Sequence, residues 1–161
     1  MNDAALQSDM QESANQDIVV EANLPHGPEA IWKALTTGEL IARWLQMTPT
    51  GFEAVKGKHF TYQTTAAGAW DGVIRCQVLD VVPYQRLVYS WKGGHESIKA
   101  GYGTLLDTVV TWTLQKIERG TRLHMVHSGF VLPRNDSAYK NMSGGWKKVV
   151  PRVGEIAGEQ G

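Results

Sequence analysis

Histidine is the residue type of this sequence with the widest chemical range, because imidazole binds metal ions and exchanges protons near neutral pH. The chain has five histidines. His124 and His127 are three residues apart in a strand-like segment, so they face opposite sides and cannot share a metal ion. His26, His59 and His95 have no partner at ligand spacing. We therefore predict no metal site and no cofactor.

His127 is the one titratable residue on the apolar side of its predicted strand, together with Leu123 and Met125. Two interpretations of this position stay open. His127 is either a core histidine that is satisfied by a hydrogen bond, or a polar group inside a pocket. In the second case it would orient a ligand or act as an acid or base.

The sequence contains no complete motif for nucleophilic catalysis or for nucleotide binding. Cys76, the only cysteine, lies on the apolar side of a predicted strand, where burial raises the pKa of a thiol and suppresses its reactivity. No Gly-x-Ser-x-Gly motif is present. Residues 101–103 begin like a dinucleotide fingerprint, but Leu106 stands in place of its third glycine. We expect a glycine-rich loop there, with Tyr102 folding over a pocket mouth.

Six tryptophans are an unusual number for a chain of 161 residues. Trp91, Trp112 and Trp146 lie on the inward sides of their predicted elements, and Trp32 is expected in ordinary core. The inward set either fills the core or forms the wall of a cavity that suits flat or apolar ligands. The candidate ligand-binding residues are Trp44, Trp91, Tyr102, Trp112, Met125, His127 and Trp146.

The elements that must position these residues follow an α+β order. A β-rich run at 18–22 precedes two short helices at 29–35 and 39–45. Alternation of apolar and polar residues then predicts five or six strands, interrupted by a glycine-rich loop over 92–106. Runs of antiparallel strands with segregated helices are typical of an α+β domain.

One long helical pattern closes the chain. Its apolar residues share one face because they recur every three or four positions: Tyr139, Met142, Trp146, Val149, Val153 and Ile156. Gly144, Gly145 and Pro151 weaken a helix interior, so tertiary packing must hold it. We interpret the glycine pair as a place where the helix presses against the sheet or a ligand. One helix can cover so many strands only if the sheet curls around it.

Composition excludes several classes of protein. The 16 basic and 16 acidic residues give a formal net charge of zero, which disfavours nucleic acid as a partner. No apolar run approaches the ~20 residues of a membrane span, and one cysteine cannot form an internal disulfide. Residues 1–16 are polar and acidic, which predicts a disordered tail before a single domain at 17–158. The tail lacks the features of a signal peptide, so we predict a cytoplasmic protein.

Four stretches carry a family resemblance: LPHGPEAIWKALTT at 24–37, VLDVVPYQRLVYSW at 78–91, GTRLHMVHSGF at 120–130 and GGW at 144–146. Together they resemble the SRPBCC (START-like) superfamily, and within it proteins related to the activator of the ninety-kilodalton heat-shock chaperone's ATPase. The resemblance implies a helix-grip fold, in which an antiparallel sheet of about seven strands curls around a long C-terminal helix. It also implies a hydrophobic cavity between helix and sheet.

The resulting hypothesis is a START-like domain that binds a hydrophobic or aromatic small molecule in this cavity. Two alternatives come from the same superfamily. One is a co-chaperone-type interaction module that modulates a heat-shock chaperone ATPase in the stress response. The other is an enzyme of the polyketide cyclase or aromatase type, with His127 as acid or base. The sequence leaves both a monomer and a homodimer open.

Overall fold

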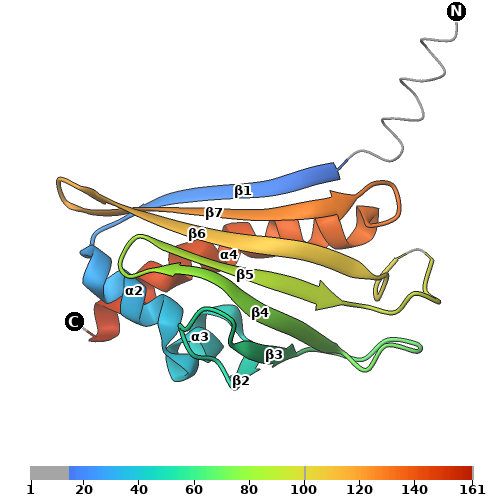
Figure 1. Ribbon diagram of the computed structural model, residues 1–161. Helices are drawn as coiled ribbons and strands as arrows, with labels where there is room; N and C mark the ends of the chain where they lie inside the picture. Colours follow the sequence, from blue (N-terminus) through green and yellow to red (C-terminus); the bar gives the residue numbers. More distant parts are fainter. Residues whose placement is uncertain (1–14, 100, 161) are drawn as a thin grey trace, which may run out of the picture.

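A computed structural model describes residues 15–99 and 101–160, which form one antiparallel sheet with a long helix along one of its faces (Figure 1). The strands are β1 (Asn15–Leu24), β2 (Thr48–Thr50), β3 (His59–Gln63), β4 (Val73–Val82), β5 (Arg86–Gly93), β6 (Leu106–Ile117) and β7 (Gly120–Val131). The helices are α2 (Pro28–Thr36), α3 (Gly38–Leu45) and α4 (Asp136–Gln160). The sheet order is β1-β7-β6-β5-β4-β3-β2. This arrangement confirms the predicted α+β helix-grip fold.

The long strands form where apolar and polar residues alternate. In β7, every second side chain from Thr121 to His127 is buried, while the residues between them are half-exposed. By contrast, β2 is only three residues long and contains Pro49, which a sheet tolerates at its edge. No alternation can show in so short a segment, which is why the sequence did not predict this seventh strand.

The first strand begins earlier than predicted. Asn15 and Gln16 were expected in the acidic tail, but they pair with Val131 and Phe130 as the first residues of β1. The rest of the predicted tail, 1–14, lies outside the described residues. Both residues are polar, and a pattern of apolar and polar side chains cannot predict that their backbone pairs with the end of β7.

The glycines of α4 that allow close packing are not the predicted pair. A Cβ atom built on Gly144 or Gly145 would meet nothing within 4 Å. One on Gly154 would lie 2.8 Å from Leu24, and one on Gly158 would lie 2.9 Å from His26. The helix therefore approaches the β1–α2 segment through its C-terminal glycines, whereas the predicted glycine pair is exposed.

The end of α3 directs the chain toward the space beside α4. Gln46 adopts a left-handed backbone conformation with φ of 63°, which ends the helix. Met47 follows before the chain enters β2. Within the described ranges, no helix combines the length and the apolar composition that crossing a bilayer requires.

Candidate functional site

The middle of the space between the sheet and α4 is filled by aromatic side chains. Trp112 on β6 is completely buried, and its ring centroid lies 5.4 Å from that of Trp44 and 5.7 Å from that of Trp146. The indole N–H of Trp112 donates to the Tyr89 hydroxyl at 3.1 Å. Met125 is also completely buried. Four candidate residues from the sequence are therefore buried here. Trp44, Trp112 and Met125 form packed core, and Trp146 packs against Trp112.

His127 lies beside this packed centre and has both ring nitrogens engaged. The indole N–H of Trp146 donates to its Nδ1 at 3.0 Å, so the proton of the neutral imidazole is on Nε2. Nε2 donates to the Thr108 hydroxyl at 2.8 Å, and that hydroxyl donates to the Trp91 carbonyl oxygen at 2.8 Å. Burial lowers the pKa of His127 from 6.5 to about 3, which keeps the ring neutral. This geometry matches the interpretation as a hydrogen-bonded core histidine.

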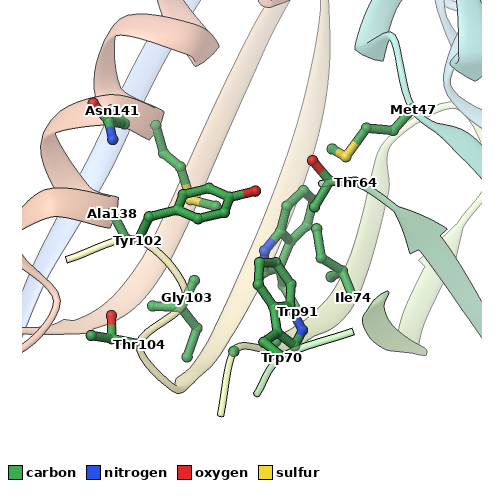
Figure 2. Close-up of a pocket in the computed structure, with 14 residues that line it drawn as sticks. Met47, Thr64, Trp70, Ile74, Trp91, Tyr102, Gly103, Thr104, Ala138 and Asn141 are labelled. Carbon is green, nitrogen blue, oxygen red and sulfur yellow. The ribbon is translucent and has the colours of Figure 1, made fainter. Parts of the chain in front are cut away.

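Open space begins at one end of the packed centre. The first cavity, here called the loop cavity, has a volume of about 130 Å³ and lies between β4, β5, the 94–105 segment and the start of α4 (Figure 2). Its lining residues come from five parts of the chain: Met47, Thr64, Trp70, Ile74, Trp91, Gly93, Gly94, Tyr102, Gly103, Thr104, Leu106, Ala138, Asn141 and Met142. None of these side chains carries a charge.

A second cavity, here called the helix cavity, adjoins the first between α3 and α4. It has a volume of about 220 Å³. Its lining residues are Leu45, Met47, Trp91, Asn141, Met142, Gly145, Trp146 and Val149. Four residues are common to both cavities: Met47, Trp91, Asn141 and Met142. The two cavities are therefore neighbours that share a wall of two methionines, one tryptophan and one asparagine.

Tyr102 borders the loop cavity. Its hydroxyl donates to the Thr65 carbonyl oxygen at 3.0 Å, and its ring centroid lies 5.7 Å from that of Trp70. In Figure 2 the Tyr102 ring extends across the cavity toward the Thr64 side. Half of the Tyr102 side chain is exposed, so it separates the cavity from solvent. Gly94 makes this loop possible, because a Cβ atom there would lie 2.0 Å from the Thr104 carbonyl oxygen.

The structure thus divides the seven candidate residues into two groups. Trp91, Tyr102 and Trp146 line one or both cavities. Trp44, Trp112, Met125 and His127 line neither of the two. Several lining residues were not predicted from the sequence, above all Met47, Trp70 and Asn141. Met47 and Trp70 lie in irregular segments, and Asn141 is a polar residue of the closing helix, so none of them belongs to a periodic apolar pattern. Met142 had a signal, since it belongs to the apolar face of the closing helix.

The chemistry available in the two cavities is apolar contact with a few neutral polar groups. Thr64, Thr104 and Asn141 supply hydroxyl and amide groups, and the other lining side chains are apolar or aromatic. Among residues 15–99 and 101–160, no three His, Cys, Asp or Glu side chains gather as a metal site would require. Cys76 is buried, and burial raises the pKa of its thiol above the ordinary range.

Comparison with known families agrees with this geometry. The sequence model described as "Activator of Hsp90 ATPase homolog 1-like protein" matches residues 25–157. The chain belongs to this family. Its membership places the chain in the SRPBCC superfamily, as the four stretches of the sequence predicted. No curated protein matches the chain.

Solved structures of bacterial proteins share the fold of this chain. The crystal structure of MLL2253 from Mesorhizobium loti has a TM-score of 0.76 and 32% identity, and the match covers 91% of this chain and 99% of that chain. The solution structure of BH1534 from Bacillus halodurans has a TM-score of 0.68 and 25% identity, covering 88% and 96%. NE0264 from Nitrosomonas europaea, at 15% identity and a TM-score of 0.68, covers 90% and 96% and shows the fold alone.

Proposed function

We propose that this protein binds a neutral, apolar small molecule in the loop cavity and the adjoining helix cavity. One observation carries the proposal: both cavities are lined mainly by aromatic, aliphatic and methionine side chains, with a few neutral polar groups and no charged residue among them. Sites of this kind hold ligands by apolar contact and orient them with a few polar groups. The filled centre around Trp112 limits the ligand to the end of the sheet where α4 begins.

The methionines support a site that adapts to its ligand. Met47 and Met142 line both cavities, and an unbranched thioether side chain changes rotamer at little cost. A shift of either side chain would change the size and shape of both cavities. A ligand larger than either cavity could then bind without a change in the sheet.

The proposal is tested with a neutral fluorescent probe, N-phenyl-1-naphthylamine, added to the full chain. Saturable enhancement of probe fluorescence, with competition by other neutral aromatic molecules, supports the binding function. Native mass spectrometry of the freshly purified protein adds a second test, because a retained ligand appears as a mass increment. No saturable response to the probe or to any competitor in a panel of neutral aromatics contradicts the proposal.

The family match favours one second function. Because the matching family is described as an activator of the Hsp90 ATPase, an interaction module that modulates such a chaperone is the alternative. It predicts that the purified chain changes the ATPase rate of the chaperone, and that variants of the cavity lining leave this effect intact. A cytoplasmic location and a monomeric or homodimeric state remain predictions of the sequence.

The cyclase or aromatase alternative receives no such support. It relied on His127 as acid or base, yet both His127 nitrogens are hydrogen-bonded within the core. A general acid or base must reach the proton that it transfers. From its position behind Trp91 and Trp146, His127 reaches neither cavity.

A further inference from the structure

Trp91 carries a buried hydrogen-bond donor that has no partner. Its side chain is 2% exposed, and its indole Nε1 makes no hydrogen bond to any residue that the structure describes. Buried N–H groups are nearly always paired, and each exception calls for an explanation. Two arginine Nε atoms share this property, but one other nitrogen of Arg122 and one of Arg152 donates a hydrogen bond, and Nε of Arg122 lies 3.4 Å from the Glu21 carboxylate. The indole of Trp91 has only one donor, so its entire hydrogen-bonding capacity is unused.

The neighbours of Trp91 cannot supply an acceptor. The nearest ring with nitrogen atoms is His127, whose centroid lies 5.2 Å away, and both of its nitrogens are already engaged. Trp146, at 5.9 Å, offers only an N–H group, and that donor is used for His127. The ring centroid of Tyr62 lies 5.5 Å from that of Trp91, but Tyr62 accepts no hydrogen bond from the indole. An acceptor for Trp91 must therefore come from the cavity side.

Trp91 is also one of the four residues common to both cavities. In Figure 2 the blue nitrogen of its indole lies on the edge of the ring turned toward Tyr102. Met47 and Met142 line both cavities together with Trp91, and they are the most adaptable side chains of the lining. A ligand that makes these side chains shift would approach the unpaired donor from the cavity that it occupies.

We propose that the bound molecule carries a neutral hydrogen-bond acceptor, such as a ketone or ester carbonyl, which accepts the indole N–H of Trp91. The inference rests on the proposed binding function and specifies its ligand class. An anionic acceptor is disfavoured because no lysine, arginine or histidine lines either cavity to balance a charge. A pure hydrocarbon would leave the donor unpaired. The ligand is therefore an uncharged, mainly apolar molecule with a carbonyl-type oxygen.

Two probes of nearly equal shape test this assignment: acetophenone and α-methylstyrene, in which a methylene group replaces the carbonyl oxygen. Each is titrated into the ¹⁵N-labelled full chain, and the indole N–H resonances of the tryptophans are followed by NMR. Acetophenone is expected to move the Trp91 indole proton downfield, as hydrogen bonding to a carbonyl does, whereas α-methylstyrene is not. Loss of one resonance in the Trp91→Phe variant assigns the signal.

The same variant measures how much the Trp91 indole contributes to the preference of the protein for acetophenone over α-methylstyrene. Trp91→Phe is expected to lower the affinity for acetophenone, relative to that for α-methylstyrene, by roughly tenfold, which is the effect of one net hydrogen bond. Trp70→Phe is the matched control, because Trp70 lines the loop cavity but already donates its N–H to the Val73 carbonyl oxygen at 3.0 Å. Trp70→Phe should leave the ratio of the two affinities unchanged.

The outcomes separate this inference from the proposed function. Suppose that both probes bind, that acetophenone does not shift the Trp91 resonance, and that Trp91→Phe leaves the ratio of the two affinities unchanged. The donor assignment is then overturned, while the binding function stands. If neither probe binds but N-phenyl-1-naphthylamine does, the donor assignment is overturned while the binding function stands. If no neutral aromatic molecule of the panel binds, both are overturned. Should Trp91→Phe fail to fold, backbone-linked NMR assignment of the unmodified chain identifies the Trp91 indole resonance, and its shift with acetophenone decides.

Discussion

The indole N–H of Trp146 donates a hydrogen bond to Nδ1 of His127 across 3.0 Å and so joins α4 to β7. The bond fixes the tautomer of the imidazole, which then donates from Nε2 to Thr108. Through the carbonyl oxygen of Trp91 this chain of hydrogen bonds extends to β5. One polar connection within an apolar core thus links α4, β7, β6 and β5.

The first prediction concerns the helix side of this connection. Trp146→Ala should destabilise the fold by roughly 3–5 kcal/mol, because the buried ring is lost. Trp146→Phe keeps most of the ring but leaves Nδ1 of His127 without its donor, so a loss of about 1–3 kcal/mol is expected. Lys147→Ala, on the exposed side of α4, should cost less than about 0.5 kcal/mol. Urea denaturation measures all three, and equal losses at positions 146 and 147 would contradict the packing of α4.

The second prediction is a pH dependence from His127. Its pKa is about 3 in the folded chain and near 6.5 when unfolded, so a proton binds the unfolded state more readily. Stability from this residue is complete above pH 6.5 and declines as the pH falls from 6.5 toward 3, by at most about 1.4 kcal/mol per unit. His127→Gln should therefore be less stable than wild type at pH 7.5, and the difference should narrow by pH 4.5.

Comparing wild type with His127→Gln removes the contribution of the carboxylates, which titrate in both proteins. Denaturant unfolding at several pH values gives the two stability curves. A difference in the free energy of unfolding that stays constant from pH 7.5 to 4.5 would show that His127 titrates normally, and would contradict its burial as a neutral ring.

The fold could be predicted from the sequence because its long elements carry strong periodicity. Alternation of buried and more exposed side chains marks most of β4 and β7, and the three-and-four spacing marks α4. The edge strand β2 could not be predicted, because a three-residue pairing depends on the position of β3 rather than on its own residues. The same holds for Asn15 and Gln16, whose strand conformation comes from the partner β7.

The candidate site was predicted only in part, for a different reason. Alternation shows which side chains point inward, and it correctly placed Trp91, Trp112 and His127 on the buried face. It cannot show whether inward side chains touch or leave space, since that depends on distances across the fold. Trp112 meets Trp44 and Trp146, whereas Trp91 borders open space.

The third prediction follows from the packed position of Trp112. Trp112→Phe leaves a void and removes the hydrogen bond to the Tyr89 hydroxyl, so a loss of about 1–3 kcal/mol is expected. Because Trp112 lines neither cavity, the affinity for N-phenyl-1-naphthylamine should change less than twofold, about 0.4 kcal/mol. Chemical denaturation and probe titration of the same preparation measure the two quantities. A large change in affinity with unchanged stability would place Trp112 in the binding site.

The fourth prediction concerns Tyr102 as a cover of the loop cavity. Tyr102→Phe removes the hydrogen bond to the Thr65 carbonyl oxygen but keeps the ring against Trp70. Since an exposed hydrogen bond contributes about 0.5–1.5 kcal/mol, probe dissociation should become several-fold faster, with little change in thermal stability. Stopped-flow dilution of the loaded protein gives the rate. An unchanged dissociation rate in both Tyr102→Phe and Tyr102→Ala would show that ligands do not pass this residue.

The last prediction uses the exposed glycine pair of α4 to test the helix cavity. Gly145 lines this cavity and Gly144 does not, yet a Cβ atom on either would meet nothing within 4 Å. Leucine at either position should stabilise the helix by up to about 1 kcal/mol, because glycine is a poor helix former. The two variants are therefore matched in their effect on folding and differ in where the new side chain lies.

Gly145→Leu places an isobutyl group at the wall of the helix cavity, where it competes with a ligand for space. We expect Gly145→Leu to lower the affinity for N-phenyl-1-naphthylamine by about tenfold or more, equivalent to about 1.4 kcal/mol. Gly144→Leu should leave this affinity within about twofold of the wild-type value. Thermal melts verify that both variants fold, and probe titrations give the dissociation constants. Equal affinities in the two variants would show that the probe does not occupy the helix cavity, and would confine ligand binding to the loop cavity beside Trp91 and Tyr102.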